Sequence, residues 1–524
     1  MTWMGSFLPI VILSSFSLSH VCVKLASLRL YLRVSANQCN NTRCQQMTPL
    51  ATHFGIWMLK RLYKSLTSSS KSSASDKSPP ISYADSSQEA PEIISRDNHC
   101  ISRKQISKNA LTVIYDLRRA GYEAYLVGGG VRDLLLERSP KDFDIATNAT
   151  PEQVQQTFRR ARIVGRRFRI AHVRFGREII EVTTFRGSHE QVEDPQRKNN
   201  TSQTNDQGML VRDNVYGNLH DDAMRRDFTI NALYYSIDGF SVLDYTGGIE
   251  DLKNRQIRII GEASQRYAED PVRMLRAIRF KAKFDFELEA ETAAPIRSSG
   301  HLLAQVAPAR LFDEMIKLLL SGKGQQTFKL LVEYQLFDTL FPATAPFIRA
   351  DKPADNFDYQ LISNALANTD LRVHQGKPVT PAFLYAALLW PVVREEAESA
   401  IADGAPRLRA LQVAGHYAVD TLLGTIAIPK RFSIPMREIW TLQQRLETAH
   451  GKRAITVLQH PRFRAAYDFL LLREQTGESV NERGEFWTAL QIEHPVDREE
   501  IRQADKKRPR RRRRAPTNNQ GASE

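Results

Sequence analysis

A glycine-rich turn followed by two closely spaced carboxylates most constrains what this chain can fold into. Leu126–Asp133 reads LVGGGVRD, and Asp142 and Asp144 follow in SPKDFDIATN. The pattern predicts a short buried strand, a tight turn that opens a helix, and then an extended segment that carries the two aspartates. Side chains alternate along a strand, so both aspartates are expected on one face. Like charges this close repel unless a cation lies between them.

Each half of this pattern also has an ordinary interpretation. Glycine turns between a strand and a helix are common, and this one lacks the P-loop ending and the Rossmann spacing. An isolated Asp-x-Asp is most often a solvated turn. Together they favour chemistry, because a phosphate-cradling turn, a helix and two carboxylates form the layout that metal-dependent nucleotidyl transfer needs. Glu181 in IIEVTT is either a surface carboxylate or a third metal ligand.

The charge of the chain is unevenly distributed. Its 524 residues are 42% apolar and 25% charged, which indicates a globular protein, and the formal net charge is +14. Much of that charge lies in the run 506–514, KKRPRRRRR. A block of like charges cannot bury itself, so a mobile tail is expected, with nucleic-acid phosphates as its partner in preference to a membrane surface.

Cysteine usage points to a reducing compartment. All four cysteines lie in the first hundred residues, at Cys22, Cys39, Cys44 and Cys100. Disulfides and cysteine metal sites are therefore excluded from the main body, and a cytoplasmic protein is expected.

The N-terminal segment allows two interpretations. Phe7–Val23, FLPIVILSSFSLSHVCV, resembles the apolar core of a signal peptide, but no Lys or Arg precedes it and His20 interrupts it. It is too short and polar for a stable membrane span. Either the true start is Met47 or Met58 and the reading frame is over-extended, or the segment serves export or anchoring.

Periodicity predicts an α/β region followed by a helical one. Ser107 is expected to cap a helix that Gly121 ends, and strands RIAHVRF and EIIEVTTFR follow a helix that starts at Pro151. The Ser/Pro-rich stretch 65–92 is expected to be a disordered linker, and the polar stretch 188–213 a mobile loop. From Asp270 onward helical patterns dominate, as in PARLFDEMIKLLL, FLYAALLWPVV and FRAAYDFLLLR.

Three motifs together resemble the class II nucleotidyltransferase superfamily, which comprises bacterial poly(A) polymerases and CCA-adding tRNA enzymes. They are YLVGGGVRDLLL…KDFDIAT, RRDFTINAL (225–233) and EDPVRMLRAIRF (269–280). The chain is more similar to the poly(A) polymerases, because it also contains IVGRRFRIAHV, IPKR, HPRFRAAYDFLLLR and an Arg-rich terminus. The resemblance extends from about residue 99 to 514 and leaves the N-terminal segment unexplained.

The resemblance implies a role for each matching residue. The catalytic metal pair would be Asp142 and Asp144, with Glu181 as the third ligand, and the metal would be Mg²⁺, with Mn²⁺ as a substitute. Asp227 would be catalytic, close to the ribose. Nucleotide contacts would come from Gly129, Arg132, Arg226, Asp270, Arg273 and Arg276.

Residue chemistry suits part of this assignment. Asp270 and Arg273 are three apart in a predicted helix, so they are expected to share a face and to offer an acceptor and a planar donor fork to a base edge. His172, on an apolar strand, is interpreted as a core histidine without a catalytic role. Tyr234 and Tyr235 are interpreted as core residues, with base stacking as the alternative.

The expected fold class is α+β: a polymerase-β-like nucleotidyltransferase head with a small mixed sheet, an all-α body and a disordered basic tail. The predicted parts are an N-terminal extension and linker (1–98), the head (99–255), a helical nucleotide- and RNA-binding neck (256–350), a helical RNA-binding body (351–500) and the tail (501–524).

The predicted function is template-independent addition of AMP from ATP to RNA 3′ ends, with release of pyrophosphate, in RNA processing and turnover. CCA addition to tRNA is the alternative within the superfamily, and a non-catalytic RNA-binding adaptor is the alternative from another class. Expected partners are ATP, RNA 3′ ends, and RNA-degradation or RNA-chaperone proteins, without DNA.

Overall fold

The computed structural model describes residues 90–165, 169–187, 203–204, 210–212, 215–348, 355–478, 480 and 482–495. Three predictions fall outside these ranges: the N-terminal segment with its candidate starts, most of the Ser/Pro-rich linker, and the Arg-rich tail. The expected loop 188–213 also lies largely outside them. Within it, β7 (Gln203–Thr204) and β8 (Leu210–Arg212) pair antiparallel.

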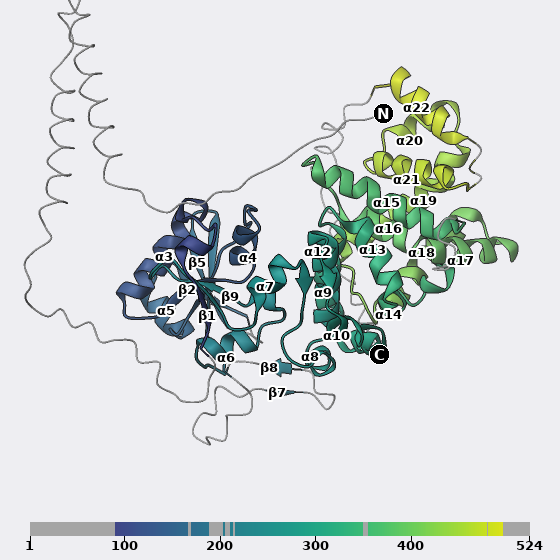
Figure 1. Cartoon of the computed structure of the whole chain (residues 1–524). Coiled ribbons are helices and arrows are strands. Elements are labelled where there is room, and N and C mark those ends of the chain that lie inside the picture. Colours follow the sequence, from purple (N-terminus) through teal and green to yellow (C-terminus); the bar gives the residue numbers. More distant parts are fainter. Residues whose placement is uncertain are drawn as a thin grey trace, which may run out of the picture. The chain divides into compact units, whose positions relative to one another are not determined.

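An eight-stranded mixed sheet forms the head, in the order β1-β10-β9-β2-β3-β6-β5-β4 (Figure 1). β3 and β6 run parallel, and the other neighbouring pairs described in this sheet run antiparallel. Its strands are β1 (Glu92–Ile94), β2 (Ala124–Val127), β3 (Asp144–Thr147), β4 (Ala161–Val164), β5 (Ile170–Phe175), β6 (Glu178–Thr184), β9 (Leu233–Tyr235) and β10 (Val242–Asp244). The predicted mixed sheet is confirmed.

The sheet begins earlier in the chain than expected. β1 (Glu92–Ile94) pairs with β10 as an edge strand, so ordered structure starts before residue 99. The sequence around β1 is mostly polar, and two of its three residues are exposed. An edge strand is held mainly by backbone hydrogen bonds to one neighbour, so it leaves little apolar periodicity in the sequence.

Two helices cover one face of the sheet. α3 (Lys108–Arg119) begins after Ser107, whose hydroxyl accepts a hydrogen bond from the Asn109 amide. Gly121, with φ +89°, follows its end. α5 (Pro151–Thr157) has Pro at its first turn and Thr150 as its N-cap. Both helices pack on the sheet (Figure 1). The buried stripe of α3 matches the prediction and consists of Ala110, Val113, Ile114 and Leu117.

Short helices complete the head and the region that follows it. α4 (Gly129–Leu135) follows the glycine turn, and α6 (Leu219–Met224) packs on the second sheet face through Leu219 and Ala223. β11 (Gln256–Ile257) and β12 (Glu287–Leu288) form a separate parallel pair. The helices from 248 to 340 are α7 (Gly248–Lys253), α8 (Ala263–Glu269), α9 (Val272–Phe284), α10 (Ala290–Ala293), α11 (Ile296–Ser299), α12 (Pro308–Leu319), α13 (Gly324–Glu333) and α14 (Leu336–Leu340).

The remaining described chain is helical, as predicted. Its helices are α15 (Phe357–His374), α16 (Pro381–Leu388), α17 (Trp390–Ala402), α18 (Arg407–Leu422), α19 (Lys430–Thr448), α20 (Gly451–Leu458), α21 (Phe463–Gln475) and α22 (Arg483–Glu493). FLYAALLWPVV is helical, as predicted, and is divided between α16 and α17, with Pro391 in the first turn of α17. Proline lacks an N–H and fits best at that position.

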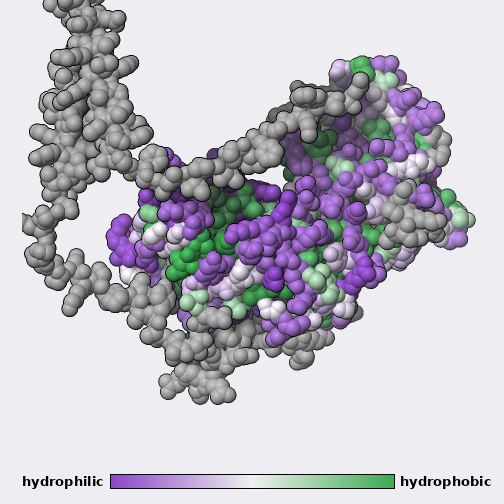
Figure 2. All heavy atoms as spheres, viewed as in Figure 1, coloured by the Kyte–Doolittle hydropathy of each residue, from purple (hydrophilic) through white to green (hydrophobic). Residues whose placement is uncertain are grey.

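One large apolar core extends from the head into the helical part. Its buried members run from Ile94 to Leu472, and a second core forms between α19, α20, α21 and α22 around Trp487. The proposed division at residue 350 stays a prediction, because the large core continues across it. In the space-filling view, hydrophilic residues cover most of the visible described surface, with apolar residues between them (Figure 2). Within the described residues, no helix is both long and apolar enough to cross a membrane.

Candidate active site

Two of the predicted carboxylates lie side by side on neighbouring strands. Asp144 is the first residue of β3 and is the register partner of Glu181 on the parallel strand β6. Partners in register project from the same face of a sheet. Asp142 lies two residues before Asp144 and outside β3. The sequence prediction that one strand contains both aspartates is therefore wrong.

Electrostatics show that these acids are close enough to interact. Burial and then repulsion from Glu181 and Asp142 raise the pKa of Asp144, Arg226 opposes the rise, and the net pKa is about 6. A carboxylate that is partly desolvated and beside two others is held ionised most readily by a cation.

The donor chemistry fits a hard divalent metal. Carboxylate oxygens are the ligands that Mg²⁺ prefers, and a Mg²⁺ site needs only one or two of them together with phosphate and water. Among the described residues, no group of three or more His, Cys, Asp or Glu side chains is arranged as a metal cluster. Asp144, Glu181 and Asp142 therefore supply suitable donors, and their closure around a metal stays a proposal.

The glycine turn brings two other functional segments into contact with the backbone. Gly128 has φ +71°, a conformation that favours glycine, and a β-carbon there would lie 3.5 Å from Arg226 Nη1. A β-carbon on Gly130 would lie 3.5 Å from the carbonyl oxygen of Asp142. The turn thus lies close to both Arg226 and the backbone of Asp142, and a side chain added there would contact them.

Arg226 is fixed by a short hydrogen-bonded cluster. Its Nη2 and Nε donate to Asp222 Oδ2 at 2.9 and 3.3 Å, and Nε also donates to the Tyr234 hydroxyl at 2.9 Å. Tyr234 in turn donates to Asp222 at 2.7 Å. Nη1 is left toward the glycine turn, so the cluster aims one donor of Arg226 at the position expected for phosphate.

Arg132 lies in a different environment from the one predicted. Its guanidinium is 5% exposed and stacks over Phe280 and Phe284 of α9, at 5.2 and 4.6 Å from the ring centroids. Its three nitrogens donate to Asp133 and Asn231. Its donors are thus occupied by protein groups, and the predicted triphosphate contact stays a proposal that requires some of these bonds to exchange.

Asp227 is held by three elements. Its Oδ1 accepts from Asn231 Nδ2 at 3.0 Å and from the Phe228 amide at 2.9 Å, and its Oδ2 lies 2.5 Å from Arg276 Nη2 on α9. Burial opposes its ionisation, but Arg276 and these hydrogen bonds lower the pKa of Asp227 overall. Asn231 therefore links Asp227 to Arg132 within one buried network.

Asp270 and Arg273 do not share a helix face, which corrects the sequence prediction. Asp270 is an extended residue after α8, and Pro271 separates it from α9. A proline opening the second helix moves the acid out of the 3.6-residue register. Asp270 accepts a bidentate pair from Arg310 of α12 at 2.7 and 2.8 Å.

Arg273 pairs with a different acid. Its Nη1 donates to Glu269 Oε2 at 2.8 Å and to the Arg266 carbonyl at 2.7 Å. Glu269 Oε2 also accepts from Arg266 at 2.7 Å. The side chains of both members of the predicted base-reading pair are thus oriented by other residues, and the Arg273 amide donates a hydrogen bond to the Asp270 carbonyl at 2.9 Å.

Of the other interpretations made from the sequence, the one for the two tyrosines is confirmed and the one for His172 is wrong. Tyr234 and Tyr235 are buried, at 0% and 1% exposure, so their interpretation as core residues is confirmed. His172 is 27% exposed and its Nε2 lies 3.4 Å from Glu181 Oε1, so its interpretation as a core histidine is wrong. Its strand partner in register is Glu181, which draws the ring toward the open sheet face.

Sequence reasoning missed the supporting residues. These are Asp222, Asn231, Glu269 and Arg310, which hydrogen-bond to predicted site residues. The i,i+4 spacing of Asp222 with Arg226 and of Asp227 with Asn231 was available as a signal. The contact between Asp270 and Arg310 joins residues far apart in sequence and had no local signal.

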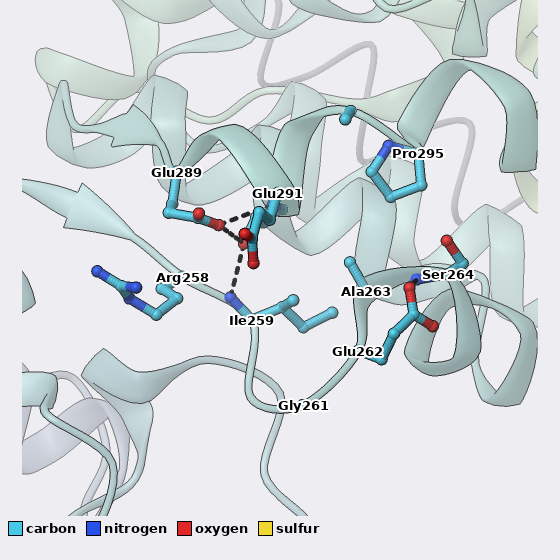
Figure 3. A pocket seen from close by; sticks show the side chains of 11 residues that line it. Arg258, Ile259, Gly261, Glu262, Ala263, Ser264, Glu289, Glu291 and Pro295 are labelled. Carbon is cyan, nitrogen blue, oxygen red and sulfur yellow. Dashed lines mark hydrogen bonds between the residues drawn. The ribbon is translucent and has the colours of Figure 1, made fainter.

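A cavity of about 610 Å³ lies away from these residues, between the segment after β11 and the starts of α8 and α10 (Figure 3). None of the predicted site residues lines it. Its carboxylates are already used: Glu289 accepts from the Thr292 amide and hydroxyl, and Glu262 caps α8. The predicted site residues therefore lie outside this cavity.

Three segments of the chain match described protein families. Residues 124–258 match the "Poly A polymerase head domain", residues 285–348 the "Probable RNA and SrmB- binding site of polymerase A", and residues 403–519 the "Polymerase A arginine-rich C-terminus". A solved structure described as "tRNA-processing enzyme (apo form 2)" has a TM-score of 0.50 with 21% identity, covering 75% of this chain and 98% of that chain. At this identity the likeness establishes the fold alone.

The sheet, the glycine turn and the paired carboxylates define a nucleotidyltransferase. Poly(A) polymerase I of Escherichia coli O6:H1 is 49% identical over 432 residues, which cover 81% of this chain and 91% of that protein. The CCA-adding enzyme of Lactobacillus helveticus is 37% identical over 227 residues, 43% of this chain and 53% of that protein. The chain belongs to the bacterial poly(A) polymerase I family.

Proposed function

We propose that this protein adds AMP from ATP to RNA 3′ ends without a template and releases pyrophosphate. The observation that carries the proposal is the register pairing of Asp144 with Glu181, with Asp142 close by and the glycine turn beside them. The resemblance to poly(A) polymerase I over most of the chain supports the same activity.

The proposed reaction is an in-line attack of the RNA 3′-hydroxyl on the α-phosphate of ATP. Asp142, Asp144 and Glu181 would hold Mg²⁺, which supplies activation of the hydroxyl and charge neutralisation on the triphosphate when bound. The turn at Gly128 and Gly129 leaves room for phosphate to approach the backbone. Arg226 presents one donor there, and positioning and electrostatics carry most of the rate.

The base and ribose of ATP would be held from α8 and α9. Asp227 and Arg276 form one ion pair at the edge of the site, and Arg276 Nε is buried without a hydrogen-bond partner among the described residues. A buried unpaired donor favours a polar ligand. Asp270 and Arg273, each fixed by its own partner, would meet the base edge as acceptor and donor.

RNA would be bound by the helical part and the basic tail. The segment 285–348 matches a family described as an RNA- and SrmB-binding site, which supports RNA and an RNA-associated protein as partners. Residues 101–524 contain no cysteine, which suits a reducing compartment. Together these observations support a cytoplasmic role in RNA turnover.

Two alternatives remain outcomes of the test. CCA addition is less supported, because the CCA-adding relatives cover about half of this chain, whereas the poly(A) polymerases cover most of it. A non-catalytic adaptor is opposed by the intact carboxylates.

The test is incubation of the protein with Mg²⁺, a generic RNA or a tRNA, and each labelled nucleoside triphosphate separately. A long ladder with ATP alone on generic RNA is expected. Dependence on CTP with a tRNA acceptor would replace the proposal with CCA addition. A lack of incorporation into any RNA would favour the non-catalytic RNA-binding adaptor.

A further inference from the structure

Among the described residues, only half of the second face of the head's sheet is covered. Over β2, β3, β9 and β10 it is buried under α6 by a small apolar core that includes Tyr125, Val127 and Tyr234. Over β6, β5 and β4, none of the described residues on this face between Arg162 and Glu181 is buried. Their neighbours on the opposite face, such as Val173, Ile180 and Val182, are buried at 1% exposure.

One row of polar side chains crosses this open half. Asp144 pairs in register with Glu181, Glu181 with His172, and His172 with Arg162. Register partners project to one side, so all four belong to the same face. β4 lies three strand spacings from β3, so the row leads about 14 Å away from the proposed catalytic carboxylates.

This half of the face carries two cations for which the described residues provide no acid partner. Arg162 and Arg174 are both exposed and lie on this face, since Arg174 is two residues beyond His172 on β5. Among the described residues, neither has an ion-pair or hydrogen-bond partner. An arginine left free in this way presents its full donor fork to an outside phosphate.

Two exposed aliphatic side chains lie beside these arginines on the same face. Ile179 is 41% exposed and is the register partner of Arg174, and Val164, at 36%, lies two residues beyond Arg162. Exposed sheet faces are normally polar, so bare aliphatic side chains beside unpaired arginines are unusual for a solvated face. The combination fits a ligand with regularly spaced anions and flat apolar groups.

We propose that this strip (Arg162, His172, Arg174, Ile179 and Val164) binds the last few nucleotides of a single-stranded RNA substrate. The inference rests on the proposed function, because it places the RNA 3′ end at Asp144. Arg162 and Arg174 contact phosphates, and the bases lie against the aliphatic side chains and guanidinium planes. These contacts do not read sequence, which suits a substrate whose growing end changes at every addition.

The test compares two double variants of the full chain that lose the same charge. Arg162→Ala/Arg174→Ala removes the strip's cations, and Lys108→Ala/Arg119→Ala removes two exposed cations from α3 on the covered side of the sheet. Affinity for a labelled oligoadenylate is measured by fluorescence anisotropy over a range of salt concentrations, with Mg²⁺ and without ATP. Both variants keep the tail, so its contribution cancels.

The strip variant is expected to bind more weakly and to lower the slope of log affinity against log salt by about 0.7 for each lost phosphate contact. The control is expected to keep the wild-type slope. Arg162→Glu/Arg174→Glu is expected to weaken binding further, and thermal melting verifies that each variant is folded. Equal slopes for the strip variant and the control would overturn the proposal. The strip would then be a candidate surface for binding a protein partner.

Binding is read without nucleotide, so the result stays separate from the proposed function. A wild-type protein that binds RNA with the predicted strip dependence but incorporates no AMP contradicts the activity alone. A wild-type protein that makes poly(A) while the strip variant binds normally contradicts the strip alone.

Discussion

Asp144 on β3 and Glu181 on β6 are register partners in a parallel strand pair, and Asp142 lies just before β3. This arrangement explains why the chain places two acids, separated by one residue, at the start of an apolar strand. The acids lie at the rim of the sheet where its second face opens, and the repulsion among them raises the pKa of Asp144. The fold therefore maintains a concentration of negative charge that a divalent cation would relieve.

The charge on Asp144 should make the metal-free protein less stable at neutral pH. The folded-state pKa of Asp144 is about 6 against an ordinary 3.8, so the folded state favours the proton, and stability should fall as pH rises from 3.8 through about 6. Asp144→Asn should remove this loss, which is on the order of 1.4 kcal/mol per pKa unit.

The measurement is the melting temperature of wild type and Asp144→Asn in EDTA across that pH range. The variant should be the more stable above pH about 6, and the two should converge toward pH about 4. Added Mg²⁺ should raise the melting temperature of the wild type and change the variant less. A constant difference at all pH values would contradict the assignment.

Asn231 should act as a positioning residue. It is 6% exposed and joins Arg132 to Asp227, so Asn231→Ala removes one hydrogen bond from each of two buried groups. The expected cost is about 1–3 kcal/mol in unfolding free energy, with a fall in kcat/KM for ATP. Asn254→Ala, at an exposed site beside α7, is the matched control. Urea unfolding and ATP titration measure the two effects. A stability loss with unchanged ATP kinetics would make Asn231 purely structural.

Arg273 should contribute to nucleotide choice. It is anchored by Glu269, so its remaining donors have a fixed direction. Arg273→Ala should weaken the use of ATP by on the order of 1–3 kcal/mol and reduce discrimination against the other three nucleotides. Arg273→Lys keeps the charge but loses the planar fork, and should recover rate more than selectivity. If Arg273→Ala slows all four nucleotides in equal proportion, the residue positions phosphate and does not read the base.

The basic run 506–514 should set RNA affinity. It lies outside the described residues, within the segment that matches the arginine-rich C-terminal family. Truncation after Asp505 should raise the KM for RNA, reduce the salt slope by about 0.7 for each lost phosphate contact, and lower processivity. RNA-binding isotherms and product-length distributions are the measurements. An unchanged salt dependence would indicate that the tail binds another partner.

Local patterns in the sequence predicted local structure well. The helix after Ser107, the hairpin of β5 and β6 and the helix α12 follow from caps and periodicity, which act within a few residues. Three motifs identified the family, and they contain the carboxylates that are proposed to bind the metal. What failed was also specific: Pro271 broke the helix expected to join Asp270 to Arg273, and His172 proved to be partly exposed.

Non-local pairing could not be predicted in the same way. The parallel register of Asp144 with Glu181, the edge strand β1 and the pair of Asp270 with Arg310 all join segments distant in sequence. Strand alternation predicts which face a residue occupies, but the register between strands depends on the packing of the whole sheet. For the same reason the sequence predicted the acids of the site, while the residues that hold the arginines in place became apparent from the structure.

Asp142 and Asp144 are proposed to act in catalysis, and RNA binding is proposed to depend on other residues. The most direct measurement is single-turnover AMP incorporation by Asp142→Ala and Asp144→Ala, with RNA affinity measured in parallel and Glu178→Ala, on the opposite sheet face, as a control. Incorporation should be abolished in both aspartate variants while RNA affinity stays close to that of the wild type. Retention of substantial turnover by either variant would contradict the account.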